Sequence, residues 1–177
     1  MEFKNSHSKS SARVMEMVQI ALMIALTYLA ASYLNIPNGY GGVVQFGDTI
    51  IIVTAVLLGT RQAAISGTIA MTMFDGFSQY AYYAPYTFVI KLVMALIVGL
   101  FANAGGTKGQ NWTRNILGIV IAGAWQVLGY FAAETFMYKS FMTAAASVLA
   151  NVIQVSVCGV AAALLLIALR KTRYFQN

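Results

Sequence analysis

The sequence is poor in charged residues and contains almost no cysteine or histidine. Only 9% of its 177 residues are charged, whereas soluble domains average about 25%. The single cysteine, Cys158, and the single histidine, His7, exclude a disulfide framework and a zinc site built from these residue types. Neither a GxxxxGKS/T phosphate loop nor an HExxH motif occurs. We therefore expect no metal, no cofactor and no nucleotide site in this chain.

Apolar residues dominate what is present. They make up 59% of the sequence, and the mean hydropathy is +0.72. This composition predicts an all-α integral membrane protein without a separate soluble domain. A net charge of +6 would suggest nucleic-acid binding in a soluble protein. Here the basic residues flank apolar segments, so we relate them to membrane topology and expect no nucleic-acid partner.

Six apolar segments are the predicted membrane helices, packed in a compact bundle. The first is long enough to cross a hydrocarbon core of about 30 Å. It also exceeds the apolar region of a cleaved signal peptide, which is the alternative interpretation. The second and third are short and must extend into their flanks, or lie in a locally thin bundle. In chain order the segments are Val14–Leu34, Gly47–Gly59, Gln62–Phe74, Pro85–Asn103, Arg114–Glu134 and Ala144–Leu169.

The basic residues are distributed unevenly between the two ends of these segments. With six crossings, both termini lie on one side, and nine of the eleven bases fall in the tails or turns of that side: Lys4, Lys9, Arg13, Arg61, Lys108, Arg114, Arg170, Lys171 and Arg173. The positive-inside rule makes this side cytoplasmic. We therefore predict a disordered tail at 1–13, a six-helix membrane domain at 14–170 and a second cytoplasmic tail at 171–177.

The stretch Asp75–Lys91, DGFSQYAYYAPYTFVIK, interrupts two apolar segments with aromatic rings, an acid and a base. Tyrosines at a membrane surface commonly form an interfacial belt. Four within seven positions, next to Asp75, also suit stacking on a flat heterocycle. The glycine-rich loop 38–47 could cover such a ligand, because glycine permits close approach and hinge geometry. An ordinary surface loop is the alternative.

Three acids, Asp48, Asp75 and Glu134, fall near the outer ends of the predicted helices. Lys91 lies inside the fourth segment and should find either an anionic ligand group or a carboxylate. The structural alternatives are an ion pair with Asp75 or Glu134, or extension of the amine to the interface.

Polar residues recur at helical spacing on the last two segments. Helical periodicity places each set on one face: Gln126, Tyr130 and Glu134 on one segment, and Ser147, Asn151 and Gln154 on the other. Hydrogen bonding between helices would explain either set. Their convergence on the outer half favours a ligand site, with Trp125 at a greater depth.

The whole pattern resembles the substrate-binding S component of an energy-coupling factor (ECF) vitamin transporter. The resemblance rests on the size, the six segments, the AxxxA pair Ala21 and Ala25, the stretch QFGDTIIIVTAVLLG (Gln45–Gly59) and, most specifically, SQYAYYAPYTFVIKLVMALIVGL (Ser78–Leu100). It looks like the branch holding predicted hydroxymethylpyrimidine, pyridoxine and pantothenate carriers.

This resemblance implies a binding subunit in the bacterial cell membrane that docks on a transmembrane T component and two cytoplasmic ATPases. Such a subunit binds a water-soluble vitamin in its outer half and topples in the membrane to deliver it. Ala21 and Ala25 would contact the T component, and the first outer loop would act as a lid. The candidate substrate-binding residues are Gln45, Asp48, Asp75, Tyr83, Tyr86, Lys91, Trp125, Gln126, Glu134, Asn151 and Gln154.

The vitamin and two other functional classes stay open at this point. The aromatic cluster and the acids favour a pyridoxine-like or hydroxymethylpyrimidine-like ring, whereas Lys91 would suit the carboxylate of pantothenate. A stand-alone secondary transporter would be supported by inverted repeats, and the sequence shows none. An intramembrane enzyme would have to use Asp48, Asp75 or Glu134, because His7 lies in the tail. We expect a transport subunit without enzymatic activity of its own.

Overall fold

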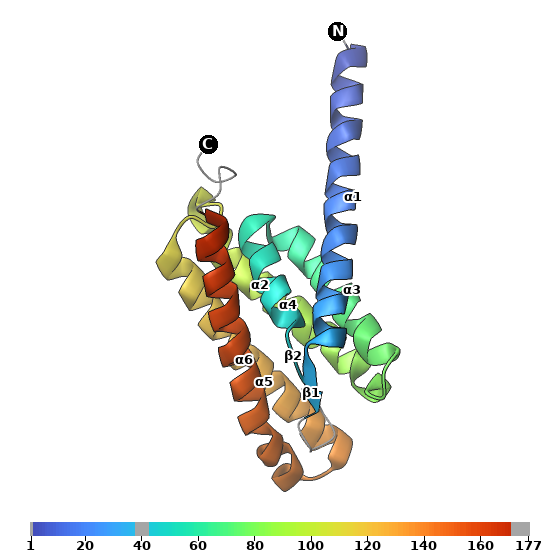
Figure 1. Ribbon diagram of the computed structural model, residues 1–177, viewed down its shortest axis with the longest axis vertical. Helices are drawn as coiled ribbons and strands as arrows, with labels where there is room; N and C mark the ends of the chain where they lie inside the picture. The colour runs from blue at the N-terminus through green and yellow to red at the C-terminus, as the bar shows by residue number, and fades with distance from the viewer. Residues whose placement is uncertain (1, 38–42, 171–177) are drawn as a thin grey trace.

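The computed structural model describes residues 2–37 and 43–170, with side chains from residue 11 onward. It contains six α-helices (Figure 1): α1 (Glu2–Tyr33), α2 (Gly47–Leu57), α3 (Thr60–Gly76), α4 (Ala84–Asn103), α5 (Trp112–Tyr138) and α6 (Phe141–Arg170). Two short 3-10 helices, η1 (Ala81–Tyr83) and η2 (Ala104–Gly106), flank α4. The predicted helical fold is confirmed.

Three local features differ from the sequence prediction. Helix α1 continues through residues 2–13, which we expected to be disordered. Neither glycine nor proline occurs before Pro37, so no residue type that breaks a helix interrupts it. Arg61, which we placed in a turn, lies in the first turn of α3. Helix α5 runs past Glu134 to Tyr138 and ends at Lys139, whose φ of 50° is left-handed.

The predicted first loop contains a small antiparallel hairpin, β1 (Asn35–Pro37) and β2 (Val43–Gln45). Asn35 pairs with Gln45 and Pro37 with Val43. The backbone N–H of Phe46 donates to the carbonyl of Leu34, at 3.1 Å. The central part of the proposed lid, 38–42, lies outside the described residues. The hairpin fixes Gln45 immediately before the start of α2.

Helix α2 is the short central element of the bundle and packs against α1, α3, α4 and α6. Its close contact with α3 depends on Gly67. A Cβ at that position would lie 2.7 Å from the Cγ1 atom of Ile51. Most of α2 is buried, including Ile51 and Asp48. A charged residue of α2 is therefore enclosed by the other helices.

The connections fall at two ends of the bundle (Figure 1). The first turn of α1, the last turn of α6, the α2–α3 turn and η2 lie toward one end, and the hairpin and the α5–α6 connection lie toward the other. Among the described bases, Arg61 and Lys108 belong to the former set, whereas Lys139 belongs to the latter.

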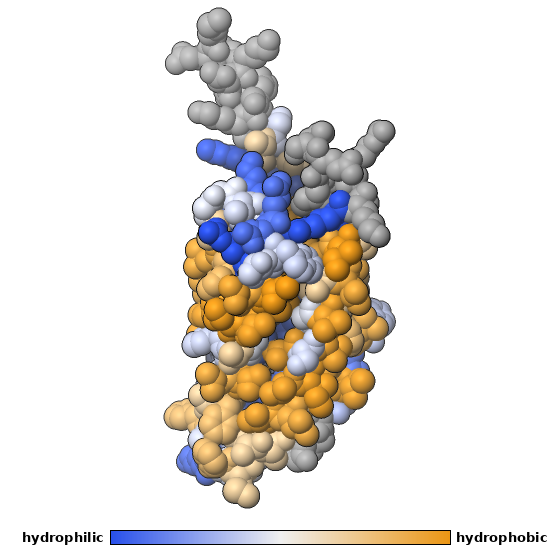
Figure 2. All heavy atoms as spheres, turned by 90° about the vertical axis from the view of Figure 1, so that its left-hand side faces the viewer, coloured by the Kyte–Doolittle hydropathy of each residue, from blue (hydrophilic) through white to orange (hydrophobic). Residues whose placement is uncertain are grey.

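The surface is that of a multi-pass membrane protein. Figure 2 shows a broad apolar belt beneath a polar band at the end where the termini lie. Among the described residues, four helical segments are long and apolar enough to cross a membrane: Ser11–Tyr33, Ala81–Gly106, Trp112–Tyr138 and Phe141–Arg170. Helices α2 and α3 are shorter, so the count of six crossings stays a prediction.

Candidate functional site

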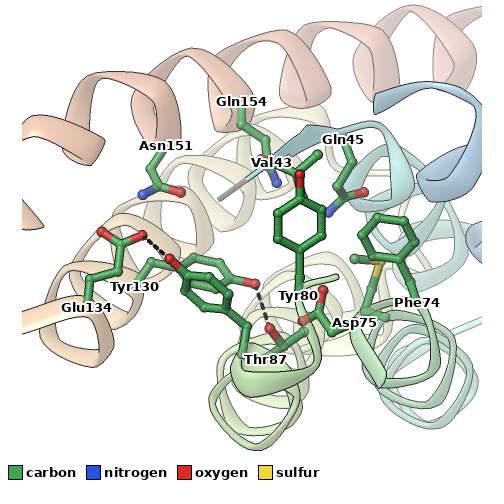
Figure 3. A pocket seen from close by; sticks show the side chains of 12 residues that line it. Val43, Gln45, Phe74, Asp75, Tyr80, Thr87, Tyr130, Glu134, Asn151 and Gln154 are labelled. Carbon is green, nitrogen blue, oxygen red and sulfur yellow. Dashed lines mark hydrogen bonds between the residues drawn. The ribbon is translucent and has the colours of Figure 1, made fainter. Parts of the chain in front are cut away.

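A pocket opens between the hairpin and the nearby parts of α3, α4, α5 and α6 (Figure 3). The void left between its side chains is about 30 Å³, which is room for one or two water molecules. The residues around it are Val43, Gln45, Met71, Phe74, Asp75, Tyr80, Tyr83, Thr87, Tyr130, Glu134, Asn151 and Gln154. Any larger ligand must displace side chains to enter.

Aromatic rings form much of the pocket wall. Phe74 and Tyr80 are stacked with their ring centroids 6.4 Å apart, and Tyr83 meets the edge of Tyr130 at 6.3 Å. These rings come from α3, from the α3–α4 connection and from α5. Offset and edge-to-face arrangements of this kind are favourable for π systems. Much of the surface that faces the void is therefore aromatic.

Glu134 is held at one side of the pocket by hydroxyl groups. Its Oε1 atom accepts from the hydroxyl of Tyr83 at 3.2 Å, and its Oε2 atom accepts from Ser147. The Tyr83 hydroxyl also lies 3.0 Å from that of Tyr138. These contacts join η1, α5 and α6 around one carboxyl group.

Asp75 stands opposite, at the end of α3, and is buried. Its side chain interacts with the hydroxyl of Thr87, which in turn lies 3.1 Å from the hydroxyl of Tyr130 (Figure 3). The amine of Lys91 lies 5.3 Å from the centre of the Tyr130 ring, a cation–π distance.

Next to the pocket lies a buried charged group that we call the Asp48 cluster: Asp48, Lys91, Gln126 and Gln154. The Nζ atom of Lys91 is 2.6 Å from Oδ1 of Asp48, and the two side chains are 0% and 1% exposed. The Nε2 atoms of Gln126 and Gln154 each donate to Oδ2 of Asp48 at 2.7 Å. One carboxylate thus ties α2, α4, α5 and α6 together.

The ion pair corrects our structural alternative for Lys91. The partner is Asp48, and neither Asp75 nor Glu134 forms a salt bridge with Lys91 among the described residues. Helix α2 begins at Gly47, so Asp48 occupies its first turn, where the helix dipole favours a negative charge. Because this turn lies in the interior, Asp48 meets Lys91 there.

The structure brings six of the predicted substrate-binding residues together around the pocket: Gln45, Asp75, Tyr83, Glu134, Asn151 and Gln154. Asp48, Lys91 and Gln126 belong to the adjacent cluster and do not line the pocket. Trp125 donates its indole N–H to the carbonyl of Ile90 at 3.1 Å, which joins α5 to α4. Tyr86 is half-buried and does not line the pocket.

Sequence reasoning missed Thr87 entirely, although a signal for it exists. Tyr83, Thr87 and Lys91 are spaced at four-residue intervals, as are the polar residues of α5, and all three are buried. Val43, Met71 and Phe74 also line the pocket. These apolar residues carry no pattern that distinguishes them from core residues.

Two further features concern metals and partners. Within the described part of the chain, no group of three His, Cys, Asp or Glu residues lies close enough to hold a metal.

Ala21 and Ala25 are exposed on α1. Glu16, on the same helix, forms an exposed ion pair of 2.9 Å with Arg61 at the start of α3.

Comparison with known proteins gives one partial relative and one family. A Pyrococcus woesei protein described as "Uncharacterized protein in gap 3'region" is 35% identical over 97 residues, which are 55% of this chain and 62% of that protein. The chain therefore matches less than two thirds of that relative's length.

The sequence profile of the family described as "ECF-type riboflavin transporter, S component" matches residues 11–171. The expectation of an ECF S component is thus confirmed, while the branch of hydroxymethylpyrimidine, pyridoxine and pantothenate carriers is not. The match covers nearly the whole chain and shows that this protein belongs to the S component family of ECF-type riboflavin transporters.

Proposed function

We propose that this chain is the substrate-specificity subunit of an ECF-type importer and that it binds a flat, uncharged or cationic heteroaromatic vitamin in the pocket between α3, α4, α5 and α6. ECF S components as a family imply a small-molecule substrate, a T component and ATPase partners. The chain itself would bind the vitamin and carry it inward, while two partner ATPases would hydrolyse ATP.

The observation that carries the proposal is the chemistry of the pocket wall. Aromatic rings alternate with the carboxyl groups of Asp75 and Glu134, and no lysine, arginine or histidine is among the described residues that line it. Lys91, the base we considered for a ligand carboxylate, is engaged by Asp48 at 2.6 Å. An anionic vitamin such as pantothenate would meet two carboxyl groups and no basic side chain, which disfavours it.

Three vitamins or precursors fit this description. The family's description makes riboflavin the first ligand to test. Pyridoxine and hydroxymethylpyrimidine, which the sequence resemblance suggested, share the flat ring and the absence of a carboxylate. Each is larger than the void of about 30 Å³, so binding would require side chains that line the pocket to move apart.

The same proposal includes six crossings with both termini cytoplasmic, in a bacterial plasma membrane. The uneven distribution of basic residues supports this topology. The exposed pair Ala21 and Ala25 on α1 would form the contact with the T component, because small residues let transmembrane helices approach closely.

The test is direct ligand binding by the purified protein in detergent or nanodiscs. Riboflavin, pyridoxine, hydroxymethylpyrimidine and pantothenate are each titrated, and any co-purifying small molecule is identified by mass spectrometry. We expect saturable binding of at least one of the three ring compounds and much weaker binding of pantothenate. Tight binding of pantothenate alone would contradict the proposed substrate class.

A further inference from the structure

The carboxylate of Asp48 fixes the orientation of the two glutamine side chains that contact it. A carboxylate has no hydrogen to donate, so a glutamine that contacts it must present its nitrogen. Gln154 donates Nε2 to Oδ2 of Asp48 at 2.7 Å and also lines the pocket. With the nitrogen engaged, the amide oxygen of Gln154 is the atom left for a ligand, and no partner for it occurs among the described residues.

Gln126 shows that the carboxylate dictates this orientation. Its Nε2 atom also donates to Asp48, at 2.7 Å, and its Oε1 atom is buried without a partner in the described part of the chain. An unpaired buried acceptor is unfavourable. The opposite orientation of the Gln126 amide would be worse, because its oxygen would then face the negatively charged oxygen of Asp48. The same repulsion fixes the orientation of Gln154.

Lys91 supplies the counter-charge of this carboxylate in the protein interior. Its amine lies 2.6 Å from the other oxygen of Asp48, and both side chains are almost completely buried. A carboxylate in the protein interior needs such a counter-charge, because an unpaired buried charge is strongly unfavourable. The ion pair therefore holds in place the carboxylate that orients Gln154.

We propose that Asp48 and Lys91 are positioning residues for substrate recognition. By orienting Gln154, they place a hydrogen-bond acceptor in the pocket. The pocket then selects ring ligands that offer a donor, such as an imide N–H, an exocyclic amine or a hydroxyl group. Neither residue touches the ligand. This inference rests on the proposed function, since it concerns ligands of the same pocket, and it adds which edge of the ring is recognised.

The experiment compares each ring compound with a derivative that lacks one donor. Riboflavin is paired with its derivative methylated on the imide nitrogen, hydroxymethylpyrimidine with that methylated on the amine, and pyridoxine with the methyl ether of its phenolic hydroxyl. The measured quantity is the ratio of the two dissociation constants. For a pair that binds, the wild type should prefer the unmethylated compound by at least about tenfold.

Replacing the Asp48 carboxylate by an amide should reverse the orientation of the Gln154 side chain. In Asp48→Asn the side-chain NH2 group can donate to both glutamines, so Gln154 turns and presents its nitrogen to the pocket. The preference should fall by about tenfold or invert. The double variant Asp48→Asn/Gln154→Glu restores an acceptor toward the ligand and a negative charge near Lys91. It should recover the wild-type preference.

Further variants keep the test independent of folding defects. Lys91→Met/Asp48→Asn carries the same amide without an unpaired buried charge, and it should lose the preference as Asp48→Asn does. Gln154→Met leaves the ion pair in place, and this variant should also lose the preference for the unmethylated compound. The matched control is Glu16→Gln, a carboxylate-to-amide change on α1, where Glu16 pairs with Arg61 and does not line the pocket. It should leave the ratio unchanged.

The outcomes separate the two proposals. If no ring compound binds the wild type, the proposed function fails and this inference fails with it. If a pair binds but its ratio is the same in the wild type and Lys91→Met/Asp48→Asn, or is retained in Gln154→Met, the positioning role is overturned while the proposed function stands. Loss in these variants and recovery in Asp48→Asn/Gln154→Glu supports both.

Discussion

Lys91 and Asp48 form a fully buried ion pair, with 2.6 Å between Nζ and Oδ1. Removing only the cation leaves a carboxylate enclosed by four helices. We expect Lys91→Met to lower the free energy of unfolding by about 3–5 kcal/mol, because an unpaired buried charge is strongly unfavourable. Thermal unfolding of the purified protein, followed by tryptophan fluorescence, measures the effect.

Lys91→Met/Asp48→Leu should regain most of this loss, since it removes both charges at once. Arg61→Met is the surface control. It breaks the exposed pair with Glu16 and should cost at most about 1 kcal/mol. Equal effects of Lys91→Met and Arg61→Met would show that the buried pair has no special role in stability.

Tyr83→Phe tests the hydroxyl that links Glu134 to the pocket wall. The substitution keeps the ring against Tyr130 but removes a hydroxyl that lies 3.2 Å from Oε1 of Glu134. We expect affinity for the bound ring compound to fall by about fivefold, the worth of one ordinary hydrogen bond. Tyr33→Phe, on a side chain that is 81% exposed, should leave the dissociation constant unchanged. An unaltered constant in Tyr83→Phe would remove that hydroxyl from the site.

Gly67 is a point of close contact between α2 and α3. A Cβ there would lie 2.7 Å from Cγ1 of Ile51, so Gly67→Ala should destabilise the protein by about 1–3 kcal/mol through overpacking. Gly76→Ala is the matched control in the same helix, because its Cβ would meet nothing within 4 Å.

Combining Gly67→Ala with Ile51→Ala should cost less than the sum of the two single changes, since each makes room for the other. Additive losses in the thermal unfolding temperature would contradict direct contact at this point.

Ala21→Trp tests the proposed docking face on α1. The residue is exposed, so a larger side chain should leave ligand binding intact. It should reduce co-purification of the T component and vitamin uptake by at least about tenfold, because close helix approach needs small residues. Val120→Trp, on an exposed position of α5, serves as the control. Normal uptake by Ala21→Trp would exclude this face from subunit coupling.

Much of the fold could be predicted because apolar runs and turn residues are local signals. All six predicted helices appear, and the errors lie at ends, as with the continuation of α1 through residues 2–13. The hairpin was missed because its strands are three residues each. Such short strands leave no periodic pattern.

The candidate site was predictable where a helical stripe carried polar residues, as at Asn151 and Gln154. The partner of Lys91 was not. Which acid reaches it depends on the depth at which α2 begins relative to α4, and packing against α1, α3 and α6 sets that depth. Periodicity within one helix contains no information about its position along the membrane normal.

The ion pair also bears on how the chain is made. Lys91 lies 43 residues after Asp48, on a helix synthesised two elements later. A charged side chain is costly in an isolated transmembrane helix, by about 2.5–3.5 kcal/mol when it lies at the helix centre. Helix α2 is short and carries an acid that has no cation until α4 emerges from the ribosome. We therefore expect α2, α3 and α4 to insert together in one late step of biogenesis, in which the acid and the base enter the bilayer as a neutral pair.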